Sequence, residues 1–398
     1  MTAVSDIQLP EQIRRIIDTP KAGLGIPWGK GGEAIFLGGG GTPAQELVRE
    51  DDFADELSRV IRATPPRRGE THPIAAWIAQ YESEHRSGQE VRAEQVVTTT
   101  GGGQRAIIDV VRALVVPGDV VAIEDPAYLG ALSTLRRAGA VLAPIPVDEE
   151  GLRVDLLEER LREGLRPKLL YTVPTFQNPT GAELGLDRRR RIAELADRYG
   201  FLILEDDPYG DLRYRGQALP HIAQYAPERT IVVGTFSKTI TTRWRGGWTV
   251  APPALVPAVR AGAELGGGGP DYVLDAIANL LARPGWFADG VRVRTEVYGA
   301  RLAALRSALR DELGDELEIG DPAGGLFLWL SIRDRRLSAA RLAQIAAGHD
   351  LFFVQASPFV VKNPLPQAFR LTFAPISEER TREGVARLAA AVRAGLRE

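Results

Sequence analysis

The sequence predicts an α/β protein in which a large domain holds a mostly parallel, mixed sheet sandwiched by helices, followed by a smaller α+β domain. Short apolar segments alternate with amphipathic stretches through the middle of the chain. Strands that alternate with helices imply crossover connections, and therefore a largely parallel sheet with helices on both faces. Beyond about residue 312 the pattern changes to short strand candidates between helices. At 398 residues the chain is long enough for more than one domain.

The elements follow from the periodicity of the apolar residues. In the large domain we expect strands at 95–99, 119–123, 168–173, 201–204, 230–234 and 247–251, and helices at 104–115, 130–138, 188–199 and 253–264. A long helical region, 272–312, leads to strands at 317–319, 325–331, 351–354 and 368–373 and to a closing helix at 377–397. We expect a large domain at 51–295, a small domain at 296–398, and an N-terminal segment, 1–50, that joins the small domain.

The composition excludes several classes of protein. The chain has no cysteine, and its four histidines lack metal-ligand spacing, so neither a disulfide nor a metal site is predicted. A net charge of −3 argues against a nucleic-acid partner. No apolar run is long enough for a signal peptide core or a membrane span. We therefore expect a cytoplasmic enzyme with no membrane partner.

A lysine stands directly after one predicted strand. Lys238 follows the strand at 230–234, Thr235 and Ser237 lie beside it, and Arg245 comes seven residues later. Ligands of α/β sheets bind outside the carboxyl ends of the strands, and hydroxyl groups with an arginine suit a phosphate. The pattern suggests a cofactor that carries both a phosphate and an aldehyde. A surface lysine in a hydroxyl-rich loop is the alternative.

A glycine-rich turn precedes the helix at 104–115. Gly102, Gly103 and Gln104 stand at the start of this helix, where glycines allow close approach and free N–H groups bind an anion. The same segment also matches a dinucleotide fingerprint, Gly101-x-Gly103-x-x-Ala106, with Glu124 about twenty residues further on. An NAD-binding dehydrogenase is therefore a competing hypothesis.

Polar residues follow three further strands. Tyr128 could stack on a planar ring, although a core tyrosine is equally compatible with its segment. Asn178 lies in a Pro/Gly-rich turn where a cis Asn-Pro bond could direct its amide inward. Asp206 could pair with a protonated ring nitrogen, and Tyr209 could donate to a ring oxygen.

Together these groups fit pyridoxal 5′-phosphate (PLP). The glycine turn would take the phosphate, Asp206 the pyridine nitrogen, Asn178 and Tyr209 the 3-hydroxyl oxygen, and Lys238 the aldehyde carbon. A nicotinamide site would explain the glycine turn and the acidic residue, but neither the lysine–arginine pair nor the Asn-Pro-Thr-Gly segment.

The motifs Asn178-Pro-Thr-Gly, Asp206-x-x-Tyr209 and Ser237-Lys238 with Arg245 resemble, in this order and spacing, those of fold-type I PLP enzymes of the class I/II aminotransferase family. The likeness is greatest to the branch that contains aminoadipate and aromatic aminotransferases, and it extends from about residue 38 to the final helix.

This resemblance implies a role for each matching residue. Lys238 would be the Schiff-base lysine and Asp206 the partner of the ring nitrogen, with Tyr128 stacked on the ring. The residues implied around the phosphate are Gly102, Gly103, Gln104, Thr235, Ser237 and Arg245. Arg370 would hold the substrate α-carboxylate, next to Asn178 and Gly39. Family members are typically homodimers, and they act on an amino acid and a 2-oxo acid.

Three segments depart from the family pattern. Residues 63–72 lack the tyrosine that commonly reaches the phosphate of the neighbouring subunit, residues 266–269 are all glycine, and so are residues 38–41 at the substrate entrance. These changes spare the cofactor residues named above and alter the substrate side. Transamination of an unusual substrate is the expected reaction. The alternative is another PLP reaction of a specialised pathway, namely oxidative deamination, elimination or replacement, or cyclisation.

Overall fold

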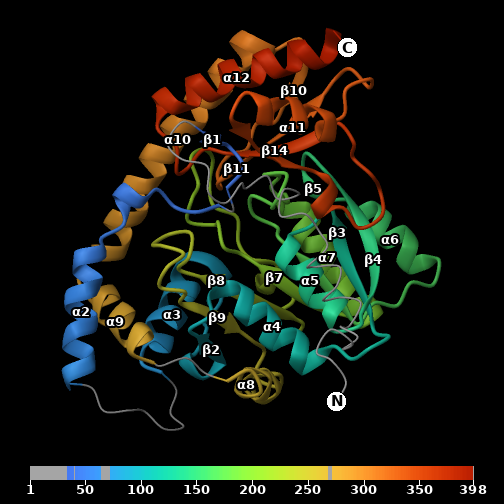
Figure 1. The fold of residues 1–398 in the computed structure, drawn as a ribbon. Helices are drawn as coiled ribbons and strands as arrows, with labels where there is room; N and C mark the ends of the chain where they lie inside the picture. Colours follow the sequence, from blue (N-terminus) through green and yellow to red (C-terminus); the bar gives the residue numbers. More distant parts are fainter. Residues whose placement is uncertain (1–33, 40, 64–71, 268–270, 398) are drawn as a thin grey trace, which may run out of the picture.

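The computed structural model describes residues 34–39, 41–63, 72–267 and 271–397. An 8-stranded sheet forms the centre of the molecule (Figure 1). In spatial order its strands are β2 (Val96–Thr99), β9 (Gly247–Val250), β8 (Thr230–Thr235), β7 (Leu202–Asp206), β6 (Leu169–Thr172), β3 (Val120–Asp125), β4 (Val141–Asp148) and β5 (Gly151–Leu152). The strands from β8 to β4 run parallel, and β9, β2 and β5 pair antiparallel with their neighbours. The expected mostly parallel, mixed sheet is thus confirmed.

Alternating side chains of the strands pack on two layers of helices. Ile123 and Leu204 belong to the apolar core that also contains residues of α4 (Gly102–Leu114), α5 (Leu129–Arg137) and α8 (Val256–Glu264). Ala122 and Ile203 lie on the opposite face and pack with α6 (Val154–Arg162) and α7 (Leu186–Tyr199). On that same face Val232 packs with α3 (Ile74–Glu82) and α9 (Tyr272–Leu281). The sheet is therefore buried on both sides, as its near-continuous apolar strands require.

Three elements between residues 139 and 167 were not predicted, namely β4, β5 and α6. Pro144 and Pro146 interrupt the apolar run of β4, and proline is unfavourable inside a sheet because it donates no hydrogen bond. In the structure this stretch of β4 pairs on one side alone, with β3, so the missing donors can face the open edge.

A smaller antiparallel sheet follows the large one in the chain. Its order is β10 (Leu317–Ile319), β11 (Phe327–Ile332), β14 (Ala368–Thr372) and β13 (Val354–Gln355), and α11 (Ala339–Gly348) and α12 (Glu378–Arg397) cover it. The single strand expected at 351–354 is wrong in detail. It divides into β12 (Leu351–Phe352), which pairs with β1 (Ile35–Phe36), and β13, which pairs with β14.

The helical region expected at 272–312 is interrupted once. Helix α9 ends at Leu281, and α10 (Trp286–Leu313) begins after Pro284 and Gly285. Helix α10 runs from beside α9 and α2 (Glu50–Ala63) to α12 at the far end of the molecule (Figure 1). It crosses residue 295 without a break, so the domain limits at 295 and 296 stay a prediction.

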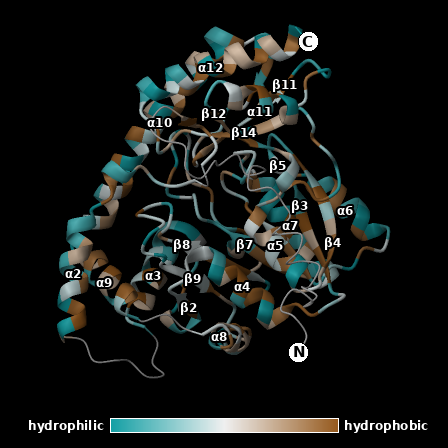
Figure 2. Ribbon diagram, viewed as in Figure 1, coloured by the Kyte–Doolittle hydropathy of each residue, from teal (hydrophilic) through white to brown (hydrophobic). Residues whose placement is uncertain are grey.

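Helix α2 is largely hydrophilic in Figure 2, consistent with its sequence, in which acidic and basic residues predominate.

None of the helices in the described ranges is long and apolar enough to cross a membrane.

Candidate active site

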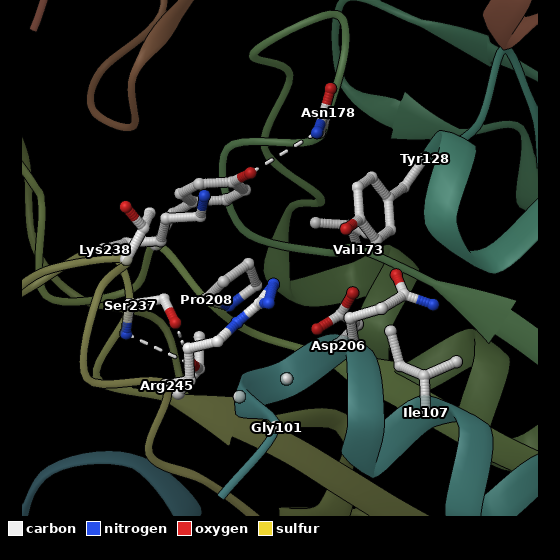
Figure 3. A pocket seen from close by; sticks show the side chains of 16 residues that line it. Gly101, Ile107, Tyr128, Val173, Asn178, Asp206, Pro208, Ser237, Lys238 and Arg245 are labelled. Carbon is white, nitrogen blue, oxygen red and sulfur yellow. Dashed lines mark hydrogen bonds between the residues drawn. The ribbon is translucent and has the colours of Figure 1, made fainter. Parts of the chain in front are cut away.

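A cavity of about 690 Å³ opens at the carboxyl ends of β6, β7 and β8. Eleven of the thirteen residues proposed from the sequence line it (Figure 3), namely Gly102, Gly103, Gln104, Tyr128, Asn178, Asp206, Tyr209, Thr235, Ser237, Lys238 and Arg245. Arg370 and Gly39 adjoin it through Asn178, as described below.

The glycine turn forms one end of the cavity. Gly102 begins α4 with a φ of +68°, and a Cβ atom there would lie 3.1 Å from Ser237 Oγ. Thr235 Oγ1 lies 3.0 Å from Ser237 Oγ and accepts a hydrogen bond from the Ser237 backbone N–H. Two hydroxyl groups and the N-terminus of a helix therefore meet in a narrow space, in which a side chain at position 102 would crowd Ser237.

A cation completes this end of the cavity. Arg245 follows β8 in an exposed turn with a φ of +52°. Among the residues that the structure describes, none forms a hydrogen bond or an ion pair with its guanidinium group. A helix N-terminus, hydroxyl groups and an arginine without a partner among the described residues are groups that an anion such as a phosphate prefers.

Asp206 and Asp207 are adjacent in sequence but face different surroundings. Asp206 ends β7 on the cavity side, and its Oδ2 accepts a 2.6 Å hydrogen bond from Tyr171. Burial, together with the negative charge of Asp207, raises the pKa of Asp206 to about 7. Asp207 instead forms ion pairs with Arg86 and His221 behind the cavity. Asp206 is thus the carboxyl group of this pair that lines the cavity.

Lys238 extends into the cavity from the turn after β8. Its Nζ donates a 2.9 Å hydrogen bond to the carbonyl oxygen of Gly41. Burial and the nearby positive charge of Arg370 lower the pKa of Lys238 to about 8. At neutral pH this amine is still mostly protonated, but it loses its proton more readily than an ordinary lysine, which suits a nucleophilic or proton-accepting role.

Asn178, Tyr209 and Arg370 form a polar chain beside the lysine. The Asn178 amide donates to the Tyr209 hydroxyl at 3.4 Å, and it accepts a 2.7 Å hydrogen bond from Arg370 Nη1. Arg370 Nη2 donates to the Gly39 carbonyl oxygen at 3.1 Å. The expected cis bond before Pro179 is present.

Tyr128 and Gln104 occupy another wall. Burial, together with the charge of Asp206, raises the pKa of Tyr128 to about 12, so its phenol stays neutral. The Gln104 side chain donates to the Gly130 carbonyl oxygen and to Thr134 Oγ1, both in α5. Gln104 therefore offers its backbone N–H, rather than its side chain, at the start of α4.

Glu124 does not occupy the position that a dinucleotide site requires. Its carboxyl group is buried and accepts hydrogen bonds from the Thr172 hydroxyl, the Val173 N–H and the Gln177 amide. Burial raises its pKa to about 7. Because protein groups already use both carboxylate oxygens, the dehydrogenase hypothesis loses its acidic ribose ligand.

Several residues of the site had no sequence signal. Tyr171 contacts Asp206 from the neighbouring strand, and Ile107, Val173, Pro208 and Thr242 line the cavity. The alternation within β6 places Tyr171 on the cavity face, but its partner becomes evident only once β6 and β7 are aligned. Positions 64–69, where the sequence lacks the tyrosine of the family, lie outside the described residues, as do Gly268 and Gly269. Gly266 is described and packs against Arg105. No group of acidic and histidine side chains in the described ranges could hold a metal ion.

Comparison with known proteins gives consistent results. The model of the family "Aminotransferase class I and II" matches residues 58–388. Aromatic-amino-acid aminotransferase 1 of Thermococcus litoralis is 33% identical over 306 residues, covering 75% of this chain and 72% of that protein. The 2-aminoadipate transaminase of Thermus thermophilus is 32% identical over 368 residues, covering 89% of each.

Solved structures extend the similarity to nearly the whole chain. The α-aminoadipate aminotransferase LysN of Thermus thermophilus, complexed with N-(5′-phosphopyridoxyl)-L-leucine, is similar with a TM-score of 0.83 at 30% identity, covering 99% of this chain and 97% of that one. The kynurenine aminotransferase of Pyrococcus horikoshii is similar with a TM-score of 0.84 at 27% identity, covering 100% and 97%.

Proposed function

This chain belongs to the class I and II aminotransferase family, and from this premise we propose that it binds PLP in the cavity around Lys238 and transfers an α-amino group from an amino acid to a 2-oxo acid. One observation carries the proposal. The amine of Lys238 shares a single cavity with Asp206, Asn178 and Tyr209, next to a glycine turn fit for a phosphate.

The residues present fit this cofactor. Gly102 leaves room for a phosphate beside Ser237 Oγ, and Arg245 offers a guanidinium group that pairs with no other described residue. At the other end Asp206 has one oxygen bound to Tyr171 and lines the cavity where a ring nitrogen would lie. When bound, PLP supplies an aldehyde that links covalently to an amine and a ring that accepts electrons as a Cα–H bond breaks.

The amine of Lys238 has two tasks in this proposal. It would hold the cofactor through the aldehyde, and as a free amine Nζ would accept the Cα proton of the amino acid and donate a proton back to the ligand. A pKa of about 8 suits both tasks, because the amine can gain and lose a proton near neutral pH. Asp206 keeps a proton on the ring nitrogen, and Tyr128 covers the ring.

The phosphate and substrate ends are held by different residues. Proposed phosphate ligands are the N–H groups of Gly102, Gly103 and Gln104 and the side chains of Thr235, Ser237 and Arg245. Arg370 binds the substrate carboxylate, together with Asn178 and Gly39. The planar guanidinium group can form two parallel hydrogen bonds with a carboxylate, which fixes the Cα–H bond relative to the lysine. We expect Arg370→Gln to raise the KM of both substrates at least about a hundredfold.

The named relatives suggest which amino donors to test. They include aminotransferases for aromatic amino acids, 2-aminoadipate and kynurenine. We propose a donor of this kind, with 2-oxoglutarate or a similar 2-oxo acid as acceptor.

The decisive experiment combines spectroscopy with a substrate panel. Purified protein should bind PLP and turn yellow, and Lys238→Ala should lose the visible band, whereas Lys362→Ala, at an exposed position, should keep it. Phenylalanine, tyrosine, kynurenine and 2-aminoadipate are then supplied with and without 2-oxoglutarate, while keto acid, ammonia and oxygen uptake are followed. Product that forms without any acceptor would refute transamination in favour of another PLP reaction.

Two further statements belong to this proposal. We expect two copies of the chain to assemble, which light scattering of the purified protein would test. We also propose a large domain at 51–295 and a small domain at 296–398, with residues 1–50 contributing to the small domain and to the substrate entrance; residues 1–33 lie outside the described residues.

A further inference from the structure

We propose that Asp125 is a positioning residue for substrate recognition. Its carboxylate holds the loop at 361–363, and this loop keeps the ring of Phe359 stacked on Arg370. The inference rests on the proposed function in one respect, namely that Arg370 receives the substrate carboxylate.

The first step is the contact between the two sheets. Asp125 is the last residue of β3 and is 5% exposed. Its Oδ1 accepts a 2.8 Å hydrogen bond from the Val361 N–H, and its Oδ2 accepts hydrogen bonds from the N–H groups of Lys362 at 3.2 Å and Asn363 at 3.1 Å. Successive backbone N–H groups that converge in this way form an anion-binding nest, and here the anion is a side chain of the protein itself.

A second contact reinforces this attachment. The Ala127 N–H donates a 2.9 Å hydrogen bond to the carbonyl oxygen of Phe359. The segment at 359–363, which lies between the small-sheet strands β13 and β14, is therefore attached at both ends to the end of β3 of the large sheet, through Asp125 and Ala127.

The third step leads from Phe359 to Arg370. The guanidinium carbon of Arg370 lies 4.8 Å from the centre of the Phe359 ring and 4.0 Å from that of Phe327. All three residues are buried, at 4%, 1% and 1% exposure respectively. Arg370 Nε is buried without a hydrogen-bond partner in the described part of the chain. Its plane is therefore set by the two rings and by its hydrogen bonds to Asn178 and to the Gly39 carbonyl oxygen, since cation–π contacts favour a cation over the ring face.

This arrangement explains why a charged residue stands in position 125. A carboxylate offers both oxygens as acceptors, whereas an asparagine would direct an NH₂ group at one or more of the three N–H donors. The loop would then shift, and Phe359 with it. A guanidinium plane that tilts can no longer offer both N–H groups to a carboxylate, although Lys238 and the phosphate end of the site would be undisturbed.

The test compares Asp125→Asn with Asp334→Asn in the cofactor-loaded enzyme. Asp334 also accepts a backbone hydrogen bond, from Arg336 at 2.9 Å, but in the turn after β11. We expect Asp125→Asn to raise the KM of the best amino donor of the panel, and the calorimetric Kd of 2-oxoglutarate, by about ten- to a hundredfold. The kcat and the visible band should stay within about twofold of wild type, and Asp334→Asn should change none of these values.

A substrate without a carboxyl group separates a defect in carboxylate binding from general damage to the active site. If phenylalanine is the donor, phenethylamine is its counterpart, and Asp125→Asn should leave the slow single-turnover rate with the amine unchanged. An equal loss with amino acid and amine, or unchanged constants for both, would overturn the proposal.

Phe359→Leu provides an independent variant that removes the ring but keeps an apolar side chain. It should show the same selective loss, and it decides the question if Asp125→Asn does not fold. Failure of the proposed function would be recognised first, in wild-type protein that binds no PLP or reacts with no donor. In that case the inference is still tested by measuring the Kd of 2-oxoglutarate for the cofactor-free wild-type protein and comparing it with the Kd for the two cofactor-free variants.

Discussion

Replacing Lys238 by methionine should stabilise the cofactor-free protein at neutral pH. The pKa of this lysine falls from 10.5 to about 8 on folding, mainly because burial disfavours the ammonium form. A difference of about 2.5 pKa units corresponds to about 3 kcal/mol. The amine lies in an open cavity, so solvent screening reduces this value to about 2 kcal/mol. Loss of the hydrogen bond to Gly41 offsets about 1 kcal/mol at most. The net gain should therefore be about 1–2 kcal/mol.

The direction of this change in stability can be checked through its pH dependence. Below about pH 8 the lysine is charged in the folded and the unfolded protein, and the full penalty is present. Between about 8 and 10.5 the folded protein loses its proton first, so wild-type stability rises with pH relative to the variant. Urea unfolding at pH 7 and at pH 9.5 measures both values. Lys362→Met, at an exposed lysine, serves as the control and should change stability by less than about 0.5 kcal/mol. A variant that is no more stable at pH 7, or a gain that does not shrink at pH 9.5, would refute the reasoning.

Two further predictions concern the cofactor end of the site. Tyr171→Phe removes a hydrogen bond that lowers the pKa of Asp206, so this pKa should rise above about 7. A buried carboxyl group with a raised pKa makes the folded protein less stable as the pH rises towards that pKa. Urea unfolding should therefore show that the variant is less stable than wild type by an amount that grows by about 1 kcal/mol between about pH 6 and 8.5. A difference in stability that is independent of pH would contradict this. Gly102→Ala and Gly118→Ala both introduce a side chain at positive φ, of +68° and +92°, but only the first meets neighbouring atoms, in the phosphate cradle. Both should therefore lose about 1–2 kcal/mol of stability, while equilibrium dialysis should show PLP binding weakened, by about tenfold, in Gly102→Ala alone.

Much of the large sheet could be predicted from the sequence, because each strand there is a short apolar run between turn-forming residues. The prediction failed at β4, where Pro144 and Pro146 weigh against a strand unless the strand is known to lie near an open edge. It also failed at residues 351–355, where one apolar run serves two sheets. In both cases the missing information was the identity of the pairing partner.

The sequence by itself determined the chemistry of the site. Lys238, Asp206 and Asn178 each follow directly from a strand or turn that local pattern can locate, and parallel strands place their carboxyl ends along one edge. Only the tertiary structure decided which groups meet across the chain. Arg370 contacts Asn178 across 192 residues, and Asp125 holds the loop at 361–363 across 236 to 238 residues. Such contacts depend on how two sheets pack, and no periodicity within a single segment encodes that packing.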